Sequence, residues 1–450
     1  MKAKSILMIA LALTLAGPAA AQEAEGLAVT VYNGGYAVVR DIRSLDIGKD
    51  KTVRYTDVAR LIDPTTVHFR SLTDPAAKLL EQNYQYDLVS ADKLLDKYID
   101  RQIEVVTDKS VYRGTLLSFD GGQIVLEQGG NGGIVMVQRA ENVRDIRFSE
   151  LPGGLLTRPT LVWLVATDKP GKQLTEVTYQ TGGMGWHAEY VMVLGDKDTK
   201  ADLSGWVSVD NKSGKTYRDA KLKFIAGDVR RVQPPRPMMF GSNSGRAGGM
   251  AAPMEEKAFF EYHMYLLPRP STVADNEVKQ LEMFPPARDV KVNKRYVYTG
   301  VGKKAEVWVD FKNEQANGLG MPLPAGKVRV YKQDPDDKAI EFVGEESIDH
   351  TAKNEKLELM IGHAFDIACE RKQVSFRSQP RWSEEKVEIL LRNHKTEPVE
   401  IEVKLNVGTN WQITESSLQY EKKDASTILF RIPVKPEVEV KLTYTIERRW

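Results

Sequence analysis

The sequence predicts a mainly β protein built of immunoglobulin-like antiparallel β-sandwiches, with a small SH3- or Sm-like barrel near the N-terminus. In residues 437–447, apolar residues occupy every second position and polar residues fill the others. A period of two is typical of a strand with one buried face. Similar short runs recur along the chain between turns rich in Gly, Pro and Asn. A short helical pattern over residues 90–98 precedes five brief strands, which indicates the barrel.

The N-terminus has the composition of an export signal. Lys2 and Lys4 precede an apolar run over residues 6–15, and small residues lead to a cleavage site after Ala21. We therefore expect residues 1–21 to be a signal peptide that is removed, and the mature protein to be periplasmic or secreted. Because no cysteine follows the cut and the apolar run is short, we expect neither a lipid anchor nor a retained transmembrane segment.

Residues 22–89 and 90–150 are the next two predicted parts. The first contains alternating strands that can pair with a later sheet instead of standing alone. In the second, Ser90 is a candidate N-cap of a short helix, and Gly121-Gly122 is a hairpin turn within the strands that follow. One helix and five short strands fit a small barrel of SH3 or Sm type.

Two β-sandwich regions account for the rest of the chain. In residues 155–335, a strand is predicted around Trp163, and the run 190–194 is apolar on both faces, as in a central strand. Residues 234–257 of this region have no period and are rich in Gly, Pro and Met, so we expect a disordered loop there. Residues 336–450 contain several alternating strands and are predicted to form a C-terminal immunoglobulin-like sandwich.

The composition excludes some classes of partner. With 63 basic and 62 acidic residues the charge is nearly balanced, so no global field attracts nucleic acid or an anionic membrane. The basic residues of the predicted barrel are offset by acidic ones, which also disfavours RNA binding. Cys369 is the only cysteine, which excludes an internal disulfide. Its place beside Ala368 favours a small buried apolar residue over a reactive thiol.

Two segments carry a resemblance to a known family. Residues 185–190 read Gly-Trp-His-Ala-Glu-Tyr, and residues 205–228 read Gly-Trp-Val-Ser-Val-Asp-Asn-Lys-Ser-Gly-Lys-Thr-Tyr-Arg-Asp-Ala-Lys-Leu-Lys-Phe-Ile-Ala-Gly-Asp. Further matching stretches lie at 319–326, 343–346, 361–366 and 391–395. From about residue 155 to its end, the chain resembles a bacterial exported domain-of-unknown-function family that is shared with the C-terminal part of mucoidy-inhibitor proteins.

This resemblance implies an exported protein built of β-sandwiches, without established catalytic residues. The mucoidy-inhibitor name implies an influence on surface polysaccharide. Those relatives have a different N-terminal region, often with a coiled-coil insert, where this chain has the predicted barrel.

The shared residues have a structural interpretation. Trp186 and Tyr190 lie four residues apart on a predicted strand, so both project to one face and can fill the space between sheets. In the predicted turn 211–214, Gly214 can adopt a positive φ and Asn211 can bond its own backbone. We interpret these family-motif residues as structural: Gly185, Trp186, Tyr190, Gly205, Trp206, Asn211, Gly214 and Gly227.

No sequence motif assigns a catalytic residue, a cofactor or a metal ligand. The chain has no Gly-x-Ser-x-Gly elbow, no His-Glu-x-x-His helix and no cysteine pair. Two alternatives depend on how the chain folds. One is a metal site made by His350, His363 and Asp366, and the other is an acid–base dyad of His187 with Glu189, which share one face of a strand. For each histidine, a polar strand or turn position is the default interpretation.

Two hypotheses for function follow. We expect an exported, non-enzymatic cell-envelope protein that binds or scaffolds a protein or polysaccharide partner, without a nucleic-acid partner. The alternative is an unrecognised envelope hydrolase or metal enzyme that uses dispersed His, Asp and Glu residues. A version of the first hypothesis is peptide capture at a sheet edge, which predicts an unpaired, weakly charged edge strand.

Overall fold

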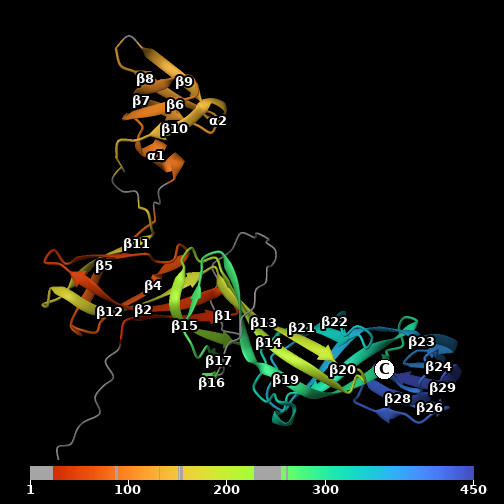
Figure 1. The fold of residues 1–450 in the computed structure, drawn as a ribbon. Coiled ribbons are helices and arrows are strands. Elements are labelled where there is room, and N and C mark those ends of the chain that lie inside the picture. The colour runs from red at the N-terminus through yellow and green to blue at the C-terminus, as the bar shows by residue number, and fades with distance from the viewer. Residues whose placement is uncertain are drawn as a thin grey trace, which may run out of the picture. The chain divides into compact units, whose positions relative to one another are not determined.

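A computed structural model describes residues 24–86, 90–130, 132–150, 152, 156–227, 255–259 and 262–450. The predicted signal peptide, residues 1–21, lies outside the described residues. So does the predicted loop up to residue 254, whereas residues 255–257 open a strand. The mainly β class is confirmed: strands make up most of the described chain, arranged in open sheets (Figure 1).

The chain divides into two compact units, each described here by itself. The first unit consists of Met1–Leu27, Arg40–Val58 and Pro64–Tyr179. The second consists of Ala28–Val39, Ala59–Asp63 and Gln180–Trp450. In this division the strand around Trp163 belongs to the first unit, whereas the predicted region 155–335 belongs to the second unit from Gln180 onward. Alternation marks each strand but does not say which sheet the strand joins, since pairing is decided by long-range contacts.

The first unit contains a five-stranded antiparallel sheet in the order β10-β6-β7-β8-β9. Helix α1 precedes it and is capped by Ser90, whose hydroxyl accepts the Lys93 N–H at 3.3 Å. Leu95 and Tyr98 from the helix region join the buried core of the sheet. The elements are α1 (Ala91–Lys97), β6 (Gln102–Thr107), β7 (Val111–Phe119), β8 (Gln123–Gln128), β9 (Gly133–Gln138), α2 (Arg139–Asn142) and β10 (Val143–Arg147).

This sheet has the elements predicted for a small barrel, but it is open. Among the described residues, β9 and β10 form its two edges and do not pair with each other. The period of the sequence specifies the strands, whereas closure depends on the tilt and stagger of the sheet. The sequence therefore could not decide between a closed barrel and an open sheet.

A second set of strands in this unit packs around Trp163. In the three-stranded sheet, β11 (Thr160–Ala166) lies between β3 (Thr52–Thr56) and β5 (Lys78–Gln85). The buried Trp163 ring stacks on Tyr55 with centroids 5.0 Å apart, and its N–H donates to Gln82 at 2.9 Å. Further strands of the chain are β2 (Tyr36–Ile47), β4 (Ile62–Ser71) and β12 (Gly171–Gly182).

The second unit contains mixed sheets, which corrects the prediction of purely antiparallel ones. Parallel neighbours in this unit include β1 with β15, β13 with β21, and β19 with β25. Parallel pairing joins strands that are distant in sequence, so a local pattern does not report it. The strands up to residue 348 are β1 (Gly26–Tyr32), β13 (Met184–Leu194), β14 (Lys200–Asn211), β15 (Tyr217–Ala226), β16 (Glu255–Phe259), β17 (Tyr262–Leu266), β18 (Ser271–Val273), β19 (Glu277–Tyr298), β20 (Lys304–Lys312), β21 (Gly326–Gln333) and β22 (Ile340–Ile348).

The C-terminal core begins before the predicted boundary at residue 336. Tyr296, Tyr298 and Ala305 are buried in the same cluster as Ile401 and Ile446. Strand β19 pairs with β14 along its first part and with β20 along its last part, so it is long enough to serve two sets of partners. The remaining elements are η1 (Gln315–Asn317), β23 (Lys356–Gln379), β24 (Trp382–Asn393), β25 (Val399–Asn406), β26 (Trp411–Ser416), β27 (Glu421–Lys422), β28 (Thr427–Val434) and β29 (Val438–Arg449).

Three strands of this unit end in the same type of buried asparagine. Asn211 ends β14, Asn313 follows β20, and Asn393 ends β24, and each side chain is fully buried. In each case the side-chain amide donates to two or more backbone carbonyls, and its oxygen accepts a backbone N–H. The carbonyl of each asparagine also accepts the N–H of a residue with positive φ just before the partner strand: Asn276, Asn354 and Glu437.

No helix in the described part of the chain is both long and apolar enough to cross a membrane.

Candidate functional site

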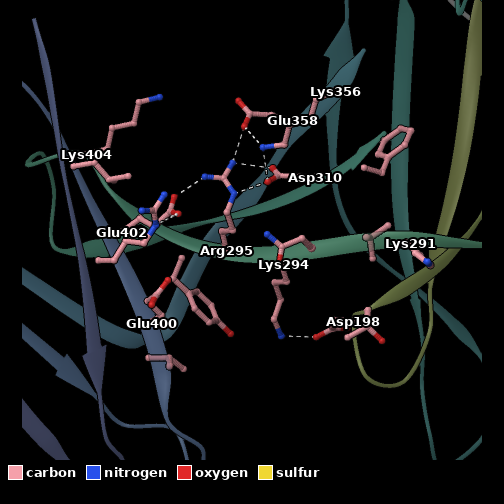
Figure 2. Close-up of a pocket in the computed structure, with 18 of the residues that line it drawn as sticks. Asp198, Lys291, Lys294, Arg295, Asp310, Lys356, Glu358, Glu400, Glu402 and Lys404 are labelled. Carbon is pink, nitrogen blue, oxygen red and sulfur yellow. Dashed lines mark hydrogen bonds and ion pairs between the residues drawn. The ribbon is translucent and has the colours of Figure 1, made fainter. Parts of the chain in front are cut away.

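A pocket of about 1180 Å³ in the second unit gathers charged side chains from several strands. It is lined by residues of β19, β20, β23, β25 and β28 and by the turn 197–199. Nine basic and seven acidic residues line it, and we call it the charged pocket. Figure 2 shows several of these side chains projecting from separate strands toward one another.

The local sequence of β19 explains why charges face this pocket. Val290 and Val292 are buried, and the intervening Lys291 and Asn293 are exposed, as the period of a strand requires. The strand then pairs with β20 on one side and runs parallel to β25 on the other. Charged residues at this junction therefore meet side chains from three different strands.

Arg295 is the centre of the charged pocket. Its guanidinium binds both carboxylate oxygens of Asp310 on β20, at 2.5 and 2.8 Å. It also donates to Glu402 on β25 at 2.6 Å and to Glu358 on β23 at 2.9 Å, as Figure 2 shows. Lys356 adds a second cation within 2.9 Å of Asp310. A planar guanidinium suits this role because it binds several carboxylates at once.

A second cluster of ion pairs involves Asp198 and Lys294, which also line the pocket. Asp198, in the turn between β13 and β14, accepts from Lys294 at 2.5 Å and also binds Lys332 of β21. The Asp198 side chain is 16% exposed, so the two lysines neutralise a largely buried carboxylate. Together they connect the turn to β19 and β21.

The electrostatics hold these groups in their charged forms. Burial raises the pKa of Asp198, but the hydrogen bonds from Lys294 and Lys332 outweigh it, so its pKa lies below the ordinary value. The hydrogen bond to Asp310 is the main reason that the pKa of Arg295 lies above its ordinary value. These groups are ionised at neutral pH, and they neither donate nor accept a proton readily.

Not every charge in the pocket has a partner. Lys197, Lys291 and Lys404 line it, and no acidic side chain among the described residues forms an ion pair with them. Lys404 also lines an adjoining pocket of about 270 Å³, together with the half-buried Trp308. Among the acids of the lining, Asp198, Asp310, Glu358 and Glu402 are ion-paired, whereas Glu397, Glu400 and Asp424 form no ion pair among the described residues. The pocket therefore presents unpaired lysines as well as unpaired acids, and Lys404 shares the adjoining pocket with an aromatic ring.

The family-motif residues do not line the charged pocket. Trp186 and Tyr190 are buried: the Trp186 N–H donates to the Ile225 carbonyl at 3.1 Å and the Tyr190 hydroxyl to the Pro324 carbonyl at 2.8 Å. Asn211 accepts the Ser213 N–H at 3.1 Å, and Gly214 has φ of +81°. Trp206 is half-buried.

The motif glycines lie where a side chain would collide with a neighbour. A Cβ on Gly205 would overlap the Phe284 ring, and one on Gly214 would overlap Arg60. Gly227 has φ of +132°, and a Cβ added to it would lie 2.6 Å from the nearest atom of the Tyr262 ring. At Gly185 the corresponding distance to the Gly35 Cα is 3.2 Å. Each contact is a packing contact.

The predicted alternatives for chemistry do not converge on a site in the described residues. No group of three His, Cys, Asp or Glu residues there is arranged to hold a metal ion. His350 instead accepts the Ala325 N–H at 3.0 Å, and Asp366 lies 3.9 Å from Lys395. The structure therefore does not bring His350, His363 and Asp366 together as metal ligands.

His187 and Glu189 do meet, with 3.7 Å between Nε2 and Oε1. Glu189 is also held by Ser208, Gln280 and Arg329. Burial opposes its ionisation, but the Ser208 hydrogen bond and the charges of Arg329 and His187 prevail, so the pKa of Glu189 is lowered. The ionised Glu189 carboxylate is thus bound by polar side chains from neighbouring strands, and we interpret it as a structural partner of His187.

Cys369 is buried in the C-terminal core. Burial raises the pKa of its thiol to about 12, although Arg392 lowers it in part. The thiolate, which is the reactive form, is therefore scarce at neutral pH.

Sequence reasoning missed the charged pocket. The two residues that form most of its ion pairs, Lys294 and Arg295, are adjacent basic residues in β19, a strand that also contributes apolar residues to the core. That is a weak signal, because a strand also carries charges on its solvent face. Searches with this chain against protein-family models and against curated proteins found no match. The family resemblance of residues 155–450 therefore stays a prediction.

Proposed function

We propose that this chain is an exported, non-enzymatic protein of the bacterial cell envelope that binds an acidic segment of a partner protein at the charged pocket. Export rests on the signal-peptide composition of residues 1–21. The proposal includes a periplasmic or secreted location and membership of the exported family that the motifs resemble. It also includes immunoglobulin-like sandwiches as the architecture of the second unit and an SH3- or Sm-type origin for the five-stranded sheet.

One observation supports binding at the pocket above all. Lys291 and Lys404 come from two different strands and have no acidic partner among the described residues, while the buried acids nearby are neutralised by Arg295 and Lys294. Unpaired cations beside a fixed network attract carboxylates from another molecule. The network itself is pre-organised, so binding orders few side chains.

A protein partner fits this lining better than a polyanionic polysaccharide. A polyanionic glycan would face the seven carboxylates of the pocket, and its repeated charge could not avoid them. A peptide can place acidic residues against the lysines and other residues elsewhere. Trp308 in the adjoining pocket adds the residue type that dominates the binding energy of protein interfaces.

The same lining argues against catalysis there. General acid–base chemistry needs a group that titrates near the working pH. Asp198 is held ionised with its pKa below the ordinary value, and Arg295 stays protonated. These groups can therefore bind a charged partner, but they do not transfer protons near neutral pH.

The test uses the chain without residues 1–21, immobilised and exposed to an envelope extract, with captured proteins identified by mass spectrometry. The affinity for the captured protein is then measured for the wild type and for the double variant Lys291→Glu with Lys404→Glu. We expect affinity to fall at least about tenfold in the double variant, and to weaken as salt rises, because both lysines act through charge.

The matched control reverses two exposed lysines outside the pocket, Lys353→Glu with Lys435→Glu, and should leave affinity unchanged. Equal binding by the pocket variant and the wild type would reject the pocket as the site. Retention of purified surface polysaccharide in place of any protein would reject the partner class, and measured turnover of an envelope substrate would reject the non-enzymatic proposal.

A further inference from the structure

Strand β9 is an open edge of the five-stranded sheet. Among the described residues it pairs with β8 alone. The Arg139 N–H donates to the Gly122 carbonyl at 2.7 Å, one position beyond the pair Gln138 and Gln123. Because hydrogen-bonded pairs alternate in an antiparallel ladder, Ile134, Met136 and Gln138 turn their own N–H and C=O groups away from β8. These groups lie along the free edge.

The chemistry of this edge is unusual for an exposed strand. β9 reads Gly-Ile-Val-Met-Val-Gln and carries no charge. Ile134 and Met136 are 65% and 62% exposed, although both are large and apolar. Natural proteins protect sheet edges with charges, prolines or bulges, because an uncharged apolar edge pairs with other chains.

The opposite edge of the same sheet is protected. β10 reads Val-Arg-Asp-Ile-Arg, and Arg147 and Arg144 form ion pairs with Glu104 and Asp108. Only one edge of the sheet is therefore left open to another strand. The two edges of the sheet therefore differ in charge and in protection.

We propose that β9 pairs antiparallel with the β9 strand of a second copy of this chain, so that two copies form one continuous sheet. This interaction surface is separate from the charged pocket. The edge is self-complementary, because a strand without charge meets its own copy without repulsion. The two-fold axis passes by Met136, because Ile134 and Gln138, the other two residues with free backbone groups, lie two positions before and after Met136.

The register follows from this axis. Met136 faces the partner's Met136, and Ile134 faces the partner's Gln138, on the exposed side of the sheet. Val135 faces the partner's Val137 on the core side. The Met136 pair and the Val135–Val137 pairs place apolar side chains together. The pairs made by Ile134, Met136 and Gln138 supply the hydrogen bonds that their free backbone groups lack.

The first experiment measures the oligomeric state of the chain without residues 1–21 by sedimentation velocity over a range of concentrations. We expect a dimer. Met136→Lys places two cations opposite each other at the axis and should raise the dimer dissociation constant at least about tenfold. Val111→Lys is the control, because Val111 is 51% exposed in the same sheet but lies on β7, away from the edge.

The second experiment tests the register by disulfide cross-linking. Cys369 is buried, so an introduced cysteine is the accessible one. Met136→Cys should cross-link two copies under mild oxidation, because facing Cα atoms of a hydrogen-bonded pair are about 5.5 Å apart. Ile134→Cys should not, because the two copies of this residue would be about 14 Å apart. Adding Gln138→Cys to Ile134→Cys should restore the cross-link.

Several outcomes would overturn the proposal. They are a wild-type monomer at all concentrations, a ring of more than two copies, a cross-link through Ile134→Cys alone, and a monomer whose β9 captures an extended peptide. Met136→Lys should keep its affinity for a partner at the charged pocket. A failure of dimerisation and a failure of the proposed function are therefore distinguishable.

Discussion

Asn211, Asn313 and Asn393 close the ends of three strands with the same set of hydrogen bonds. An amide side chain both donates and accepts, so one residue satisfies backbone groups on the turn that follows and on a strand opposite. At Asn393, the amide donates to the Glu397 and Val434 carbonyls at 2.9 and 3.1 Å, and its oxygen accepts the Lys395 N–H at 2.9 Å. The recurrence indicates that the second unit repeats one structural device three times, although the surrounding sequences differ.

Replacing any of these asparagines should destabilise the fold. Because several buried backbone groups lose their partner, we expect Asn211→Ala, Asn313→Ala and Asn393→Ala each to lower the free energy of unfolding by about 2–4 kcal/mol. Chemical denaturation monitored by tryptophan fluorescence measures the change. The control is Asn293→Ala, an exposed asparagine on β19, which should change stability by less than about 0.5 kcal/mol. Equal effects at all four positions would contradict this account of the buried amides.

At the scale of elements, β13, β14 and β19 form the centre of the second unit. β13 lies between β21 and β14, which confirms the expectation that the apolar run 190–194 belongs to a central strand. Gly205 of β14 lets the Phe284 ring of β19 cross the strand, since a Cβ there would overlap the ring. The motif glycine is thus explained by packing between neighbouring strands.

Gly205→Ala should destabilise the protein by about 1–3 kcal/mol, because the Phe284 ring is buried and has little room to move. Gly195→Ala, where the nearest atom is at an ordinary 3.5 Å, is the control and should have a smaller effect. In a double-mutant cycle, Phe284→Leu should reduce the cost of Gly205→Ala by about 1 kcal/mol. Strictly additive effects of the two changes would show that the ring is not the obstacle.

The Asp198 cluster connects the turn after β13 to β19 and β21, and it should make stability depend on pH. The folded-state pKa of Asp198 is below its ordinary value, so its ion pairs stabilise the protein above about pH 4 and are lost as pH falls through the folded pKa. The pKa of Lys294 is raised, so the same pair is lost again as pH rises above about 10.5.

Asp198→Asn should therefore reduce stability at neutral pH by about 1–2 kcal/mol, and the difference from wild type should shrink as pH falls below about 4. Asp196→Asn is the matched control, because Asp196 is exposed in the same turn. Unfolding midpoints measured from pH 3 to 8 test this. A difference that stays constant down to pH 3 would contradict the electrostatic explanation.

The whole molecule gains stability from buried sheet faces without disulfides. Its only cysteine, Cys369, is 1% exposed within the C-terminal core, and burial raises the pKa of the thiol to about 12. An envelope location would be oxidising, yet an internal bridge is impossible with one cysteine. Packing between sheets therefore carries the stability of the second unit.

Two measurements check this. The melting temperature should be the same with and without a reductant, since no internal disulfide exists to be reduced. A thiol reagent should label less than about a tenth of the chains in native buffer at pH 8 and one thiol per chain in denaturant, because only unfolding exposes Cys369. Rapid labelling of the native protein would show that the core around Cys369 opens readily.

The sequence by itself determined the strands and their buried faces. The predicted strand 437–447 corresponds to β29, and the short helix and five strands after Ser90 occur as expected. A period of two is a local property, because successive side chains on a strand point to opposite faces. Turn glycines such as Gly214 are local as well, because positive φ excludes most other residues.

Only the tertiary structure decided which strands meet. Strand β1 lies parallel to β15, far along the chain, and β19 serves two sets of partners. The charged pocket exists because Arg295, Asp310 and Glu402 come together from three strands. Likewise, only the tertiary structure separates the protected edge at β10 from the open edge at β9. Pairing and convergence depend on contacts between residues distant in sequence, and a local pattern contains no information about those contacts.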